Sequence, residues 1–196
     1  MSAPADRDPG DGARAPTPRT AGQTIGPFFH FALPWPAGPF VVAEGTPGAL
    51  RLHGRLLDGD GAPITDGLIE TWQADPRGIF PSTASGAAAF RGFGRCATDG
   101  GGRYAIVTLK PGAVRAPGGS IHAPQILVSV FARGLLKRAV TRVYFPDEAA
   151  ANAADPILTG IGDGALRATL IAAAVAGGYE FDVRMQGAGE TVFFDV

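Results

Sequence analysis

The sequence reads Ala123-Pro124-Gln125-Ile126-Leu127-Val128-Ser129-Val130-Phe131-Ala132-Arg133-Gly134 in the part of the chain from which its architecture can be worked out. The middle of this run is apolar and rich in β-branched residues, with the hydroxyl of Ser129 as its one polar side chain. A short apolar run between a proline and a glycine predicts a strand buried on both faces. Gln125 and Arg133 flank the strand, and each needs a polar partner if it lies beside a core.

Composition limits the class of protein. The chain has 196 residues, enough for one domain with its own core, and Lys plus Arg (17) nearly balances Asp plus Glu (18). This balance argues against nucleic-acid binding and suits a subunit with protein partners. The single cysteine, Cys96, excludes an internal disulfide and favours a reducing, cytoplasmic location. No apolar run approaches the ~18 residues of a membrane span, and no signal peptide is recognisable.

Residues 1–20 are predicted to be a flexible arm, because they contain no large apolar side chain after Met1. Residues 21–196 then form a single domain. Order is expected to begin within residues 23–31, an aromatic segment that is too short and irregular for a helix. Its phenylalanines need cover, either from the domain itself or from another chain.

Turn residues recur along the rest of the chain and separate short strands. Alternating or short apolar runs predict strands at residues 49–58, 68–73, 104–109, 126–131, 140–145 and 179–185. Short helices are expected at residues 147–153 and about 165–174, the second capped by Asp163. Residues 82–89 are expected to form a loop of small residues. Strands and helices do not alternate regularly, so the sequence predicts an all-β fold, a two-sheet β-sandwich with short helices in its C-terminal half.

Residue spacing alone reveals no catalytic set. The histidines, His30, His53 and His122, lie in three separate segments without metal-ligand spacing, and His53 falls on the polar side of an alternating strand. Cys96 has no neighbouring base and is better explained as a structural thiol than as a nucleophile. A metal enzyme that uses one or more of these histidines remains only a remote alternative.

Several motifs follow one another from about Gln23 to the C-terminus. They are Gln23-Thr24-x-Gly26-Pro27-Phe28, Gly54-x-x-x-Asp58-Gly59-x-Gly61-x-Pro63, Glu70-x-Trp72-Gln73-Ala74-Asp75, Phe90-x-Gly92-x-Gly94-Arg95-x-x-Thr98-Asp99, Thr108-x-Lys110-Pro111-Gly112, Phe131-Ala132-Arg133-Gly134, Thr141-Arg142-x-Tyr144-Phe145 and Gln186-Gly187-x-Gly189-Glu190-Thr191-Val192-Phe193-Phe194. Each motif alone is weak, but the ordered set resembles the intradiol ring-cleaving dioxygenases. The resemblance implies a β-sandwich paired as an αβ heterodimer within a larger assembly. It also implies a non-haem Fe(III) held by two tyrosines and two histidines, which activates a catechol toward O₂.

The ligand positions that the resemblance implies are all substituted in this chain. Phe80 and Val114 stand where the family has tyrosines, and Gln125 and Leu127 stand where it has histidines. Ferric iron needs anionic oxygen or imidazole donors, and these side chains provide neither. The resemblance therefore predicts that this chain binds no metal and that a homologous β subunit holds the Fe(III). We refer to Phe80, Val114, Gln125 and Leu127 as the substituted ligand positions.

The resemblance also implies which residues of this chain reach the partner's site, where O₂-dependent cleavage of 3,4-dihydroxybenzoate (protocatechuate) gives 3-carboxy-cis,cis-muconate. Thr24, Gly26, Pro27 and Phe28 are expected at the mouth of that site, with Phe28 where the family often has tyrosine. Arg133 is expected to bind the substrate carboxylate, because a guanidinium fork binds carboxylates bidentately. A plain turn at Gly26-Pro27 and an ion pair for Arg133 are equally open interpretations.

A different class of function is a stand-alone β-sandwich module that binds a small molecule without catalysis. The near-neutral charge and the phenylalanines of residues 28–31 argue mildly against this alternative, because exposed aromatic side chains favour a protein partner.

Overall fold

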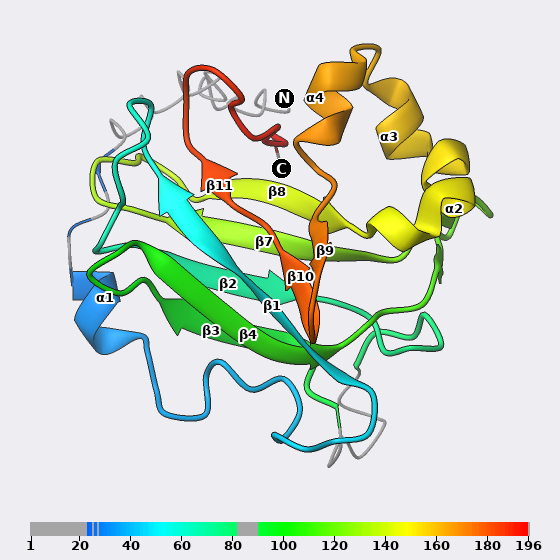
Figure 1. The fold of residues 1–196 in the computed structure, drawn as a ribbon, viewed down its shortest axis with the longest axis horizontal. Helices are drawn as coiled ribbons and strands as arrows, with labels where there is room; N and C mark the ends of the chain where they lie inside the picture. The colour runs from blue at the N-terminus through cyan, green and yellow to red at the C-terminus, as the bar shows by residue number, and fades with distance from the viewer. Residues whose placement is uncertain (1–22, 25, 27, 82–89, 196) are drawn as a thin grey trace, which may run out of the picture.

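The computed structural model describes residues 23–24, 26, 28–81 and 90–195 of the chain. These residues form two stacked sheets, with the short C-terminal helices gathered at one end and a short N-terminal helix at the other (Figure 1). The predicted all-β sandwich is confirmed. The predicted arm at residues 1–20 and the predicted loop at residues 82–89 lie outside the described residues.

Two sheets make up the sandwich within the described part of the chain. The first consists of β1 (Ala49–Leu57), β4 (Arg103–Leu109), β9 (Ala173–Val175), β10 (Gly178–Glu180) and β11 (Val183–Arg184). The second has the antiparallel order β3 (Phe93–Ala97), β2 (Leu68–Trp72), β7 (Gln125–Phe131), β8 (Ala139–Tyr144). A separate hairpin, β5 (Val114–Arg115) with β6 (Ile121–His122), leads into β7.

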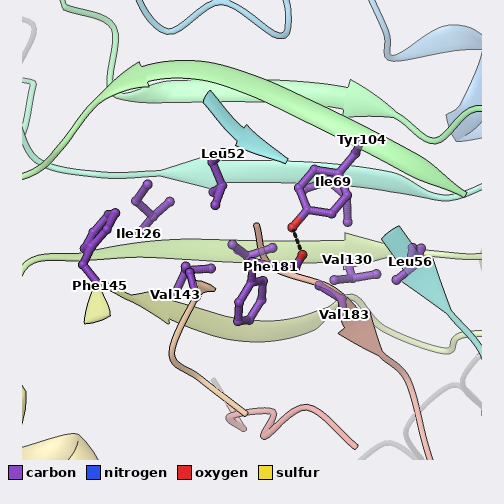
Figure 2. Packing of buried hydrophobic residues seen from close by; sticks show 12 residues of the cluster. Leu52, Leu56, Ile69, Tyr104, Ile126, Val130, Val143, Phe145, Phe181 and Val183 are labelled. Carbon is purple, nitrogen blue, oxygen red and sulfur yellow. Dashed lines mark hydrogen bonds between the residues drawn. The ribbon is translucent and has the colours of Figure 1, made fainter. Parts of the chain in front are cut away.

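The core lies between the two sheets, and β7 contributes one face to it. Ile126, Val128 and Val130 are fully buried against residues such as Leu52 and Phe181 of the opposite layer (Figure 2). The prediction that β7 is buried on both faces is wrong, because the alternate residues from Leu127 to Phe131 are only half-buried. A two-layer sandwich covers one face of each sheet, and the other face needs a further segment or a partner.

The N-terminal segment covers one end of this outer face. The expectation that residues 23–31 cannot form a helix is wrong, since α1 spans Phe28–Ala32. Phe29 is buried and its ring lies 6.5 Å from that of Phe131, which supplies the tertiary packing that so short a helix requires. Phe28 and Phe31, in contrast, are 80% and 76% exposed. The described part of the domain therefore buries one of these three phenylalanines and leaves two exposed.

The C-terminal helices partly follow the sequence prediction. The helix expected at residues 147–153 is confirmed as η2 (Pro146–Glu148) and α2 (Ala149–Ala154). The helix expected at 165–174 is α4 (Gly164–Ala168), with Asp163 accepting a hydrogen bond from the Ala165 N–H as its cap. It is shorter than predicted because the following alanines enter β9 and pair with β10, which overrides their helix propensity. The helix α3 (Pro156–Gly160) was not predicted from the sequence.

The predicted strand at residues 179–185 is divided into β10 and β11, and both pair in parallel with β1. Between them the Asp182 carboxylate accepts the Arg55 backbone N–H at 2.7 Å, so a side chain replaces one rung of the ladder. The strand β1 passes close to the segment that joins β10 to β11. A Cβ at Gly54 would lie 2.0 Å from the Phe181 carbonyl oxygen, so this position of β1 requires glycine.

Replacing Tyr104 by phenylalanine should lower the free energy of unfolding by about 1–3 kcal/mol, because a buried acceptor loses its donor. The Tyr104 hydroxyl donates to the Phe181 carbonyl at 2.6 Å inside the core (Figure 2). Urea denaturation of the full chain measures the loss. Tyr179→Phe is the matched control, because its hydroxyl donates to the exposed Asp147, and it should cost less than about 0.5 kcal/mol. Equal losses in the two variants would contradict this account of the core.

Candidate functional site

The N-terminal site residues meet the turn that follows β7. The Thr24 hydroxyl donates to the backbone oxygen of Leu135 at 3.4 Å, two residues beyond Arg133. Gly26 and Phe28 are exposed, and Pro27 lies outside the described residues. The structure thus brings Thr24 next to the turn that carries Arg133, although the two residues are far apart in sequence.

Arg133 projects from this turn and forms an ion pair. Its Nε lies 3.1 Å from Oδ2 of Asp66, and the two side chains are 70% and 25% exposed. An ion pair as exposed as this contributes no more than about 1 kcal/mol. The guanidinium can therefore exchange Asp66 for another carboxylate at small cost. The ion pair that the sequence analysis left open is present, and it leaves the carboxylate-binding interpretation open as well.

The substituted ligand positions gather around the start of β7 on the outer face of the second sheet. The Phe80 ring stacks on Trp72, with centroids 5.9 Å apart and planes 13° apart. Trp72 is the cross-strand partner of Leu127, and Gln125 lies two residues away on the same face. Val114 pairs with His122 in the β5–β6 hairpin, from which the chain reaches Gln125 in three residues.

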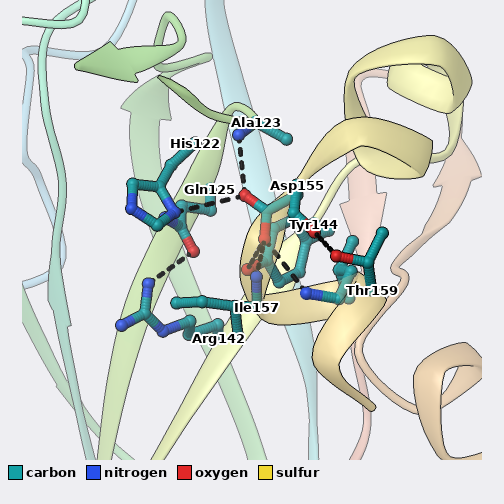
Figure 3. A network of polar contacts seen from close by, with 9 residues as sticks. His122, Ala123, Gln125, Arg142, Tyr144, Asp155, Ile157 and Thr159 are labelled. Atoms are coloured by element: carbon teal, nitrogen blue, oxygen red, sulfur yellow. Dashed lines mark hydrogen bonds and ion pairs between the residues drawn. The ribbon is translucent and has the colours of Figure 1, made fainter. Parts of the chain in front are cut away.

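Gln125 is already engaged by a cationic side chain. It is only 8% exposed, and its Oε1 accepts a hydrogen bond from Nη1 of Arg142 at 3.0 Å (Figure 3). The Arg142 guanidinium also lies 5.4 Å from the centre of the Phe194 ring. A metal cation here would face the positive charge of Arg142 and hydrocarbon from the other three positions. The residues present do not fit a ferric ion.

A buried carboxylate, that of Asp155, lies beside this place. Asp155 is 0% exposed and caps α3. Its oxygens accept hydrogen bonds from the backbone N–H groups of Ile157 (2.9 Å), Leu158 (3.1 Å) and Ala123 (2.9 Å) and from the Tyr144 hydroxyl (3.2 Å), and His122 Nδ1 lies 3.4 Å away (Figure 3). The Asp155-Pro156 pair is a recognisable helix-start signal. The contact with Ala123 leaves no such trace in the sequence.

Tyr144 is the tyrosine of this network, and it is held as a neutral donor. Burial raises the pKa of its phenol, and the Asp155 carboxylate raises that pKa further, while Arg142 opposes the shift. The Tyr144 hydroxyl is engaged with Asp155 in this network.

The other candidates from the sequence remain apart in the structure. His30 lies on α1, His53 on β1 and His122 on β6. Among the described residues, no three His, Cys, Asp or Glu side chains form a group that could hold a metal ion. Burial raises the pKa of the Cys96 thiol, which disfavours the thiolate that a nucleophile requires. Within the described part of the chain, no helix has the length and hydropathy needed to cross a bilayer.

Comparison with known proteins shows the family of this chain. Residues 26–187 match the family described as Dioxygenase. The chain is 43% identical to the protocatechuate 3,4-dioxygenase alpha chain of Burkholderia cepacia and 40% identical to that of Pseudomonas putida. These alignments cover 91% of this chain and 98% and 96% of the relatives. The chain therefore belongs to the intradiol dioxygenase family, and the resemblance inferred from its motifs is confirmed.

Within that family, the chain is homologous to both subunit types of one enzyme. Beside the protocatechuate 3,4-dioxygenase alpha chains stands the beta chain of the Burkholderia cepacia enzyme, 36% identical over 77% of this chain and 71% of the relative. Solved structures share the fold. The dioxygenase domain of a carbohydrate-binding fusion protein from Streptomyces sp. SirexAA-E is 28% identical with a TM-score of 0.54, covering 76% of this chain and 88% of that chain. Catechol 1,2-dioxygenase from Pseudomonas arvilla C-1 is 22% identical with a TM-score of 0.56, covering 76% and 56%.

Replacing Asp155 by asparagine should lower the free energy of unfolding by about 1–3 kcal/mol. The amide nitrogen must then face either the Ala123 N–H or the N–H groups of Ile157 and Leu158, so one buried donor loses its acceptor. Asp163→Asn is the matched control, since it caps α4 at an exposed site where asparagine caps equally well. Urea denaturation compares them. An Asp155→Asn variant whose free energy of unfolding is unchanged would show that the buried carboxylate is dispensable.

Proposed function

We propose that this chain is a non-iron subunit of a protocatechuate 3,4-dioxygenase and that a homologous β-type subunit holds the iron. The observation that carries the proposal is the donor set at the substituted ligand positions. Three of these side chains are hydrocarbon, and the amide oxygen of Gln125 is engaged by Arg142. The family depends on non-haem iron, so a member without ligands needs a partner that retains them. Homology to alpha chains supports this assignment.

The role proposed for this chain is to shape the partner's site and to bind substrate there, in the cytoplasm. Thr24, Gly26, Pro27 and Phe28 line the mouth of the site, and Arg133 binds the carboxylate of protocatechuate. The hydrogen bond from Thr24 to the turn that carries Arg133 supports their grouping. No step of ring cleavage is assigned to residues of this chain.

Exposed aromatic side chains support a subunit over a stand-alone binding module. Phe28 and Phe31 lie on α1 with most of their surface in solvent. Aromatic residues are enriched at the cores of protein interfaces, where their apolar area is removed from water. The partner that we propose for this surface is the iron-bearing β-type subunit.

The chain purified alone should contain no stoichiometric iron and should consume no O₂ with protocatechuate. Co-expression with a β-type chain that retains two tyrosines and two histidines should give a complex with iron and ring cleavage. Metal analysis by mass spectrometry and an oxygen electrode measure the two quantities. Stoichiometric iron with turnover in the isolated chain would refute the proposal, and a monodisperse monomer indifferent to the β-type chain would favour the binding module.

Replacing Arg133 by alanine in the complex should raise KM for protocatechuate and lower kcat/KM by roughly 10–100-fold, the value of one charge-assisted hydrogen-bonded pair. Turnover of catechol, which has no carboxylate, should be unchanged. Asp66→Asn is the matched control, since it removes the ion pair and keeps Arg133. Unaltered protocatechuate kinetics in Arg133→Ala would reduce this residue to an ion pair with Asp66.

A further inference from the structure

Arg142 carries a positive charge that no acidic side chain of the described part of the chain neutralises by direct contact. Its Nη1 donates to a neutral amide oxygen, that of Gln125, and its guanidinium rests on the Phe194 ring. Its Nε is buried and has no hydrogen-bond partner among the described residues. The neighbouring acid, Asp155, is already occupied by backbone N–H groups and the Tyr144 hydroxyl. A charge in this state favours an anion as its missing partner.

The same face offers an aromatic surface on the other side of Leu127. Trp72 and Phe80 stack on each other and are 39% and 37% exposed. The register places Trp72 opposite Leu127, and Leu127 opposite Arg142, so the three side chains lie in one row across β2, β7 and β8. Two strand spacings of about 4.8 Å separate the ends of the row by roughly 10 Å. One benzene ring that carries a carboxylate fits such a span.

We propose that the substituted ligand positions form a second binding site, which takes an aromatic carboxylate in place of a metal ion. The carboxylate binds the Arg142 guanidinium, and the ring lies over Leu127 against the Trp72–Phe80 stack. Gln125 holds the guanidinium in place through the 3.0 Å hydrogen bond. In the family, these positions supply donors that bind a metal cation. In this chain, the cation is the Arg142 side chain, and it binds an anion. The inference rests on the proposed function only in that these positions hold no iron.

The tryptophans of this chain allow a direct test, since the sequence contains only two, Trp35 and Trp72. This chain is labelled with 5-fluorotryptophan and assembled with an unlabelled β-type subunit, and its ¹⁹F spectrum is followed during titration with 4-hydroxybenzoate. The Trp72 resonance, assigned with Trp35→Phe, should shift saturably while that of Trp35 stays in place. 4-Hydroxybenzyl alcohol, which lacks the charge, should bind about tenfold more weakly or worse.

Arg142→Gln should weaken 4-hydroxybenzoate binding about tenfold or more, and Arg138→Gln, an exposed arginine before the same strand, should leave it unchanged. Gln125→Glu is the second variant. The glutamate keeps the hydrogen bond to Arg142 but neutralises the charge of the guanidinium, so it should weaken 4-hydroxybenzoate binding as much as Arg142→Gln does. If Arg142→Gln fails to assemble with the β-type subunit, Gln125→Glu alone tests the site.

A Trp72 resonance that does not move, or a shift that survives Gln125→Glu, would overturn the site. Iron analysis of the same sample keeps the two proposals apart. Iron on this chain contradicts the proposed function, whereas iron on the partner alone with a static Trp72 resonance contradicts only the second site.

Discussion

Alternation along β7 is the constraint on which the rest of the structure depends. Because successive side chains of a strand point to opposite faces, Ile126, Val128 and Val130 enter the core while Gln125 and Leu127 face outward. Packing and chemistry therefore occupy different positions of one strand. Side chains at the two outward positions can differ without creating a cavity in the core. A family member can in this way keep its sandwich while its ligand set changes.

Asp155 anchors the entry into β7 through the backbone of Ala123. A carboxylate that is 0% exposed is tolerated only when its oxygens are satisfied, and here backbone N–H groups from two distant segments supply that satisfaction. The Ala123 contact ties the segment before β7 to the start of α3. Gln125, two residues later, is thereby set at a fixed place beside Arg142. The Asp155 carboxylate thus both caps α3 and fixes the segment that leads to Gln125.

The sequence predicts features that depend on neighbours along the chain, and it fails where distant contacts decide. Alternation locates most strands, Asp163 marks a helix start, and the ordered motifs identify the family. The helix α1 could not be predicted, because it depends on Phe29 packing against Phe131. The shortened α4 depends on the pairing of β9 with β10. The hydrogen bond between Gln125 and Arg142 requires the register of β7 against β8, which no local pattern encodes.

The charge at this place follows a simple balance. A ferric ion held by two tyrosinates and two neutral histidines would carry one net positive charge, and the Arg142 guanidinium carries the same. The two cations therefore place the same formal charge beside the buried Asp155. The two cations differ in the directions in which they bind their partners. A metal ion imposes a coordination geometry on several donors, whereas a guanidinium offers planar N–H groups suited to a carboxylate. A site built around Arg142 therefore favours an anion over a metal ion.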